Sequence, residues 1–134
     1  MKVSLIFILL LFFFSASQCK KEGDDCHRSI RIVNNSDSTV IYSTILYNGI
    51  NPSQCLLTED AVISPKEYYI EYSIVCLEDR LESSDYTFFI VDPQHFNDGG
   101  FYSCDSIEFK NKVLKHYVLT LDDLKNSDFV VTYQ

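Results

Sequence analysis

Residues 68–75 read Tyr-Tyr-Ile-Glu-Tyr-Ser-Ile-Val, and this stretch decides the fold class. Its apolar and aromatic residues recur with a period of two, which is the period of a β-strand. Alternation places four of them on one face: Tyr68, Ile70, Tyr72 and Ile74. Because one face of such a strand is normally buried, we expect Tyr68 and Tyr72 in the core and Tyr69 pointing outward.

Six further segments have the composition of strands, rich in β-branched and aromatic residues. They are residues 29–33, 39–47, 86–91, 106–109, 117–121 and 128–133. Clusters of Asn, Asp, Gly, Pro and Ser separate them and are typical of turns. The sequence therefore predicts an all-β fold, a single antiparallel β-sandwich, immunoglobulin-like or similar, of about seven strands.

Helical signal is confined to short segments. Thr120 is a favourable N-cap, and the carboxylates of Asp122 and Asp123 suit the positive end of a helix dipole. One short C-terminal helical turn is expected there, and residues 78–83 are a second candidate.

The first 18 residues have the layout of a secretory signal peptide. Lys2 forms a short basic region, and the ten residues 5–14 are all apolar. This apolar run is too short for a membrane-spanning helix, which needs about 20 residues. We expect residues 1–18 to be removed on export.

The cysteine that follows decides which kind of leader this is. Residues 15–19, Ser-Ala-Ser-Gln-Cys, resemble a bacterial lipobox of the relaxed form found in lipoproteins of Bacteroidetes, with Gln18 directly before the cysteine. The resemblance implies that Cys19 is lipidated, carrying palmitate or similar acyl chains, and anchors the mature chain to a membrane. The alternative is an ordinary signal peptide cut near Ser17, which would leave Cys19 as a thiol.

A charged segment, Lys-Lys-Glu-Gly-Asp-Asp, follows at residues 20–25. Such a stretch cannot bury itself and is typical of a solvated tether. It also resembles the surface-export signals of Bacteroidetes lipoproteins. We expect residues 19–27 to form the lipidated cysteine and tether, residues 28–134 to form the domain, and the protein to lie at the outer membrane, on its surface or periplasmic face.

Charge argues against nucleic acid as a partner. Lys2 is the only charged residue of the leader, so the mature chain has 10 basic and 19 acidic residues, a net charge of −9. No cluster of Lys or Arg offsets this balance, and a protein that neutralises phosphates needs one.

Assigning Cys19 to lipid leaves an even four of the five cysteines, namely Cys26, Cys55, Cys76 and Cys104. In an exported chain these are disulfide candidates. Sequence alone leaves three pairings open, of which we prefer Cys55 with Cys76 and Cys26 with Cys104. None of these cysteines has the short spacing of zinc ligands, so we expect no metal and no cofactor.

His95 lies in the one loop whose composition suggests catalysis. Residues 92–100 combine it with two aspartates and two glycines, and Ser103 would supply a nucleophile. A nucleophile-elbow pattern is missing from the sequence, however, so we name no catalytic residue and keep a hydrolase as an alternative only.

The C-terminus, residues 113–134, resembles that of small uncharacterised lipoproteins of Bacteroidetes, in which a strand, a short helical turn and a terminal strand follow one another. The resemblance implies a small β-sandwich and supplies no activity. Two tripeptides beginning at Asp37 and Asp105 resemble the O-glycosylation pattern of the same bacteria, with Ser38 and Ser106 as acceptors.

These observations favour a non-enzymatic binding or envelope-interaction module with a protein or glycan partner at the cell surface. Tyrosines on an exposed sheet face suit such a role because they bring a large contact area at low entropy cost. A structural or assembly subunit of an envelope complex is a further alternative.

Overall fold

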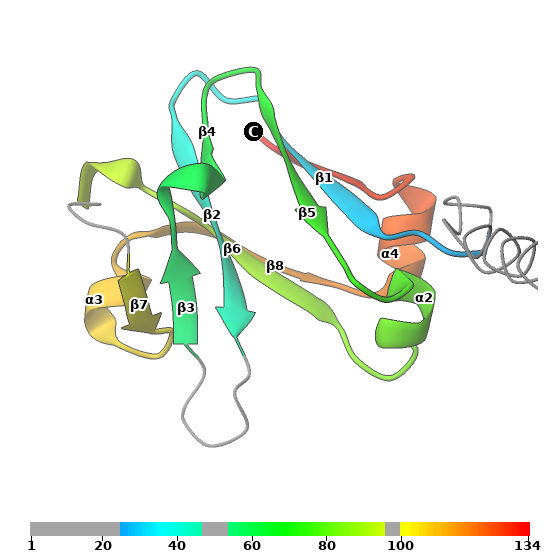
Figure 1. Ribbon diagram of the computed structural model, residues 1–134. Helices are drawn as coiled ribbons and strands as arrows, with labels where there is room; N and C mark the ends of the chain where they lie inside the picture. Colours follow the sequence, from blue (N-terminus) through cyan, green and yellow to red (C-terminus); the bar gives the residue numbers. More distant parts are fainter. Residues whose placement is uncertain (1–24, 47–53, 96–99) are drawn as a thin grey trace, which may run out of the picture.

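The structure is a computed structural model that describes residues 25–46, 54–95 and 100–134 (Figure 1). Within these ranges it contains nine strands: β1 (Ser29–Asn34), β2 (Val40–Leu46), β3 (Gln54–Leu57), β4 (Val62–Ile63), β5 (Tyr68–Tyr72), β6 (Tyr86–Val91), β7 (Gly100–Ser103), β8 (Val113–Leu119) and β9 (Val130–Tyr133). The same ranges contain three short α-helices and two 3-10 turns: α2 (Leu77–Arg80), α3 (Ile107–Lys110), α4 (Leu121–Asn126), η1 (Glu59–Ala61) and η2 (Pro93–His95).

The strands form two sheets. The three-stranded sheet has the order β5-β1-β9, and the six-stranded sheet has the order β7-β3-β2-β6-β8, with β4 paired to β2. The all-β sandwich predicted from the sequence is confirmed, with more strands than the seven expected. All pairings within these sheets are antiparallel except that of β1 with β9, which is parallel.

The core lies between the sheets and under α3. One face of β6 presents Phe88, which stacks on Tyr117 of β8 with ring centroids 4.7 Å apart. The opposite face presents Phe89, which meets Phe109 of α3 edge to face at 5.2 Å. Phe88 and Phe109 have no exposed surface. Strand β6 is therefore covered on both sides.

One predicted strand, residues 106–109, is wrong. This segment forms α3, and the Ser106 side chain caps it by accepting a hydrogen bond from the backbone nitrogen of Phe109 at 3.1 Å. A single helical turn with Phe109 buried and Ile107 exposed gives the same apolar spacing as a short strand. The prediction missed β3, β4 and β7, which are four residues long or shorter.

The short helical turn after Thr120 is confirmed as α4. The Thr120 hydroxyl accepts a hydrogen bond from the backbone nitrogen of Asp123 at 3.1 Å, and the Asp123 carboxylate accepts one from the backbone nitrogen of Thr120 at 2.9 Å. These reciprocal bonds form a capping box. Leu124, buried on the inner side of α4, fixes the helix to the core.

Two disulfides join the four described cysteines, as expected, but the preferred pairing is wrong. Cys26 is bonded to Cys76, with Cα atoms 5.0 Å apart, and Cys55 is bonded to Cys104 at 5.1 Å. The preference rested on Cys55 and Cys76 flanking one turn, whereas the register brings β3 beside β7, which ends just before Cys104. Each bridge closes a loop of about 50 residues and contributes on the order of 4 kcal/mol in the chain-entropy model.

Candidate binding face and tether junction

The outer side of the three-stranded sheet carries two exposed aromatic side chains on one strand, β5. Its outward positions, which we call the aromatic face, are Ser29, Arg31, Val33, Tyr68, Ile70, Tyr72, Val130 and Thr132. Tyr68 is 54% exposed and Tyr72 is 73% exposed. Large aromatic side chains that remain in water are typical of surfaces that contact a ligand or partner.

Arginine and tyrosine meet on this face. The guanidinium carbon of Arg31 on β1 lies 4.9 Å from the centre of the Tyr68 ring on β5. This cation–π contact favours one orientation of an otherwise solvated ring. The arrangement offers two rings, Tyr68 and Tyr72, on β5 and a cation, Arg31, on the neighbouring strand β1, which suits stacking against sugar rings or aromatic side chains.

The predicted orientation of the β5 tyrosines is wrong. Tyr69 points inward, where its ring stacks on Tyr42 of β2 at 5.0 Å, while Tyr68 and Tyr72 point outward. The alternation was identified correctly, but the more apolar face was assumed to be the buried one. The inner face instead carries Tyr69 and Glu71, whose polar atoms bond to each other between the sheets.

A cluster of tyrosines forms a polar layer between the sheets. The hydroxyl groups of Tyr42 and Tyr86 are hydrogen-bonded at 2.5 Å, and both rings are buried. Burial raises the pKa of Tyr42, of Tyr86 and of Tyr69. Burial also raises the pKa of the Glu71 carboxyl, against the opposing effects of Arg80 and of the hydrogen bond from Tyr69.

Beside this cluster lies a cavity of about 420 Å³ lined by Thr44, Ile45, Arg80, Leu81, Ser84, Asp85, Tyr86 and Thr87. This cavity could not be predicted from the sequence, because its walls come from segments far apart in the chain: β2, the end of α2 with the loop after it, and β6. Its polar side chains are hydroxyl groups together with one cation, Arg80, and one anion, Asp85. Within the cluster, Tyr42 bonds to Tyr86 and Tyr69 bonds to Glu71. Because these polar groups satisfy one another, we interpret the cluster as a structural feature and not as a ligand site.

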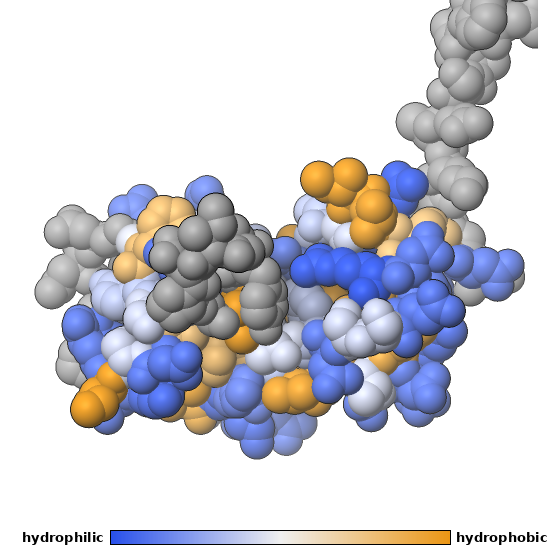
Figure 2. Space-filling model, turned by 90° about the horizontal axis from the view of Figure 1, so that it is seen from below, coloured by the Kyte–Doolittle hydropathy of each residue, from blue (hydrophilic) through white to orange (hydrophobic). Residues whose placement is uncertain are grey.

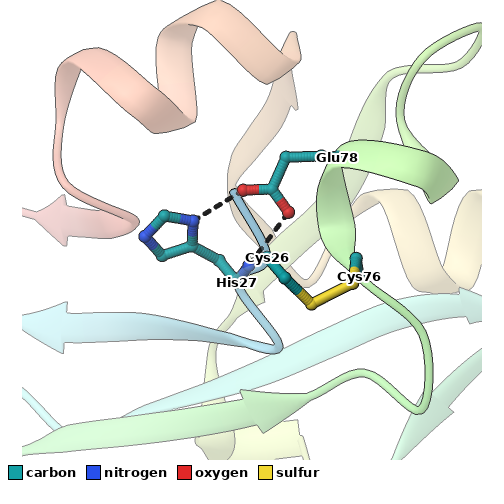
Figure 3. Close-up of a disulfide and its surroundings, with 4 residues drawn as sticks. All are labelled: Cys26, His27, Cys76 and Glu78. Carbon is teal, nitrogen blue, oxygen red and sulfur yellow. Dashed lines mark hydrogen bonds and ion pairs between the residues drawn. A yellow bond between two sulfur atoms is a disulfide. The ribbon is translucent and has the colours of Figure 1, made fainter. Parts of the chain in front are cut away.

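The second feature is the tether junction, which comprises Cys26, His27, Cys76 and Glu78 (Figure 3). The imidazole Nδ1 of His27 lies 2.6 Å from Oε1 of Glu78, and the backbone nitrogen of His27 donates to Oε2 at 2.9 Å. With the Cys26–Cys76 disulfide, these bonds fasten the start of the described chain to α2. Residues 26 and 27, which the sequence placed in the tether, contact the domain.

Phe129 completes the junction from the other side. The His27 ring stacks on the Phe129 ring with centroids 3.9 Å apart and an interplanar angle of 17°. Burial acts to raise the pKa of the Glu78 carboxyl, but the hydrogen bonds from His27 outweigh it and lower that pKa. The junction therefore holds Glu78 as a carboxylate.

The remaining sequence candidates lie apart from one another. Cys19 is outside the described residues, as is the side chain of His95. Ser103 is exposed on β7, and the carboxylate of Asp92 accepts a hydrogen bond from the backbone nitrogen of Gln94 at 2.8 Å, a turn-forming role. Nothing described links Ser103 or Asp92 to a general base.

The two glycosylation candidates differ in their surroundings. Ser38 is exposed in the loop between β1 and β2. Ser106 is half-buried, and its hydroxyl caps α3. A glycan on that oxygen would compete with the cap, so Ser38 is the better acceptor of the two.

A second cavity, of about 480 Å³, lies between α3 and the six-stranded sheet and was also missed from the sequence. Its floor includes Phe89, on which His116 stacks with centroids 4.5 Å apart. Its wall includes Cys104 of the second disulfide. In the described ranges, no three His, Cys, Asp or Glu residues are grouped so that they would hold a metal ion.

Of the helices that the structure describes, none has the length and apolar character needed to span a membrane. Comparison with known protein families, with curated proteins and with solved structures finds no match for this chain.

Proposed function

We propose that this protein is an exported lipoprotein, anchored through a lipid on Cys19, and that its β-sandwich is a non-enzymatic binding module. The leader of residues 1–18 and the lipobox-like residues that precede Cys19 support the export and the lipid. The aromatic face supports binding.

The observation that carries the anchoring is the pairing of the cysteines. The chain has five, and the four beyond residue 25 are bonded to one another, which leaves Cys19 over. Disulfides form and persist in oxidising compartments outside the cytosol, so two of them agree with export. Cys19 is the cysteine that these two disulfides do not use, and it directly follows the signal sequence, which is the position at which a lipid is attached.

The aromatic face is the surface that supports binding. Its exposed tyrosines lie on a regular, hydrogen-bonded strand, so a partner would meet a surface formed in advance and would order few groups. We expect the partner to be a glycan or a protein at the cell surface. An assembly subunit would need a large apolar area, whereas the side of the molecule drawn in Figure 2 shows small apolar patches among hydrophilic residues.

The anchoring is tested by replacing the cysteine. Cys19→Ala should move the protein from the membrane fraction to the soluble fraction and abolish palmitate labelling, whereas the control Ser17→Ala, which keeps a small residue before the cysteine, should do neither. Membrane association and labelling that survive Cys19→Ala would refute the lipoprotein proposal.

The binding is tested by site-specific cross-linking on intact cells. A photo-reactive residue at Tyr68 should capture a partner, and the same residue at Val118, exposed on β8 of the other sheet, should not. Capture of the same species from both positions with equal yield would argue against the aromatic face as the binding surface.

A further inference from the structure

Directly after β5 the chain exposes two consecutive aliphatic side chains. Ile74 is 94% exposed and Val75 is 51% exposed, and we call this pair the hydrophobic tip. Tyr72, the last residue of β5, is 73% exposed and lies two residues before Ile74. Aliphatic side chains exposed to this degree are unfavourable in water, so a surface that covers them would stabilise the protein.

The tip is held in place at both ends. The backbone nitrogen of Ser73 donates to the carbonyl of Arg28 at 2.7 Å, and that of Leu77 donates to the carbonyl of His27, also at 2.7 Å. Between these bonds, Cys76 is joined to Cys26. The exposure of Ile74 and Val75 is therefore fixed by the tether junction.

The same disulfide sets an upper limit on the distance from the tip to the lipid. Val75 is bonded to Cys76, whose Cα lies 5.0 Å from that of Cys26. Seven residue steps lead from Cys19 to Cys26, and a fully extended chain of that length spans at most about 25 Å. A lipid on Cys19 therefore keeps the tip within reach of the bilayer surface.

We propose that the hydrophobic tip inserts into the boundary between head groups and acyl chains of the bilayer that holds the Cys19 lipid, with Tyr72 at head-group level. This inference rests on the proposed lipid anchor. Apolar side chains beside a lipid attachment add a second point of contact, and tyrosines are enriched at the membrane–water interface.

A bilayer fits this feature better than a protein partner does. The tip consists of two side chains, whereas a stable protein interface buries about 1,200 Å² or more with complementary shape. A fluid lipid surface requires no complementary shape, and the tether already brings it near.

Insertion of the tip would orient the domain. Strand β5 runs from Tyr68 to Tyr72 toward the tip, so at about 3.3 Å per residue Tyr68 would stand up to roughly 13 Å farther from the membrane than Tyr72. The Tyr68 end of the aromatic face would then face the surroundings, where a partner is available.

The chain contains no tryptophan, so one introduced residue reports its own environment. The acylated mature protein carrying Val75→Trp is reconstituted into phosphatidylethanolamine–phosphatidylglycerol vesicles with and without brominated acyl chains. The control is Phe101→Trp, at a position that is 64% exposed. Phe101 lies on β7, at the left of Figure 1, whereas the tip lies between β5 and α2, toward the right. Ile74→Trp, at the most exposed position, is the second variant in case the first does not fold.

We expect brominated lipid to quench the tryptophan of the Val75→Trp variant at least about threefold more than that of the Phe101→Trp control, with a blue shift in the tip variant alone, because only the tip enters the interface. Vesicle-bound protein in which both tryptophans are quenched equally, or neither is, would overturn the insertion and leave the anchor standing. Protein that does not float with the vesicles would overturn the anchor as well. Shielding of the tip tryptophan only in native membranes that retain their proteins would assign the tip to a protein partner.

Discussion

Strands β5 and β6 have similar compositions and opposite environments. Both are rich in aromatic and β-branched residues, yet five of the six β6 residues are buried and none of the five β5 residues is. Strand β6 lies between β2 and β8, with the other sheet on one face and α3 on the other. Strand β5 is the edge of its sheet, and its outer face is open. Position in the sheet, and not composition, decides which tyrosines are available to a partner.

The largest expected effect comes from the centre of β6. Phe88→Ala should lower the free energy of unfolding by about 3 to 5 kcal/mol, since it opens a cavity where Phe88 packs on Tyr117 without exposed surface. Urea denaturation with the disulfides intact measures this change. A loss below about 1 kcal/mol would mean that β6 is not the buried strand.

The junction at the end of β5 should come next. Cys26→Ala combined with Cys76→Ala should cost about 2 to 4 kcal/mol, because a loop of about 50 residues is no longer closed in the unfolded state. Non-reducing peptide mapping of the unmodified protein checks the pairing directly. Peptides that join Cys55 to Cys76 would restore the pairing first preferred from the sequence.

Glu78 gives the junction a signature in pH. Its pKa in the folded state lies below the ordinary 4.5, so its contribution is fully present above about pH 4.5 and is lost as the pH falls through the folded value. Glu78→Gln should therefore cost about 1 kcal/mol at pH 7, and the difference from the unmodified protein should shrink in acid. A difference that grows in acid would contradict the His27–Glu78 bond.

Glu71, on the inner face of β5, should show the opposite sign. Its folded-state pKa is raised above the ordinary 4.5, so the stability that its protonation gives in acid is lost as the pH rises through the folded value. Glu71→Gln, which imitates the protonated form, should be more stable than the unmodified protein at pH 7, by less than about 1 kcal/mol because the group is partly solvated. Equal stability of the two proteins at pH 7 and their divergence in acid would argue against this environment.

The smallest effect on stability belongs to the outer face of β5. Tyr68→Ser should change the free energy of unfolding by less than about 0.5 kcal/mol, because the side chain is mostly in water and loses chiefly an exposed contact with Arg31. The same urea titration as for Phe88→Ala makes the comparison. A loss above about 2 kcal/mol would show that Tyr68 belongs to the core after all.

The sequence predicted the sandwich because the alternation of residues 29–33 and the aromatic and β-branched composition of residues 86–91 both indicate strands whatever lies around them. It also predicted α4, because Thr120 and Asp123 form their capping box from residues three apart. It predicted the wrong direction for Tyr69, since both faces of β5 carry tyrosine and the stacking of Tyr69 on Tyr42 depends on the other sheet. It predicted that the four cysteines form disulfides but not which cysteines pair, because the pairing follows from strand register.

The aromatic face and the tether junction could be predicted from the sequence only in part. Tyr68 and Tyr72 were singled out as tyrosines, but their exposure depends on which sheet closes over β5. The His27–Glu78 bond joins residues 51 positions apart and has no local signal. The lipid on Cys19 remains a prediction, because that residue lies outside the described part of the chain.

The intact mass of the protein extracted from the membrane fraction, measured before and after reduction, tests the central claim most directly. We predict a chain that begins at Cys19, carries diacylglycerol with or without a further acyl group, and gains four hydrogen atoms on reduction, two for each disulfide. A chain of unmodified mass that begins elsewhere would contradict the lipoprotein.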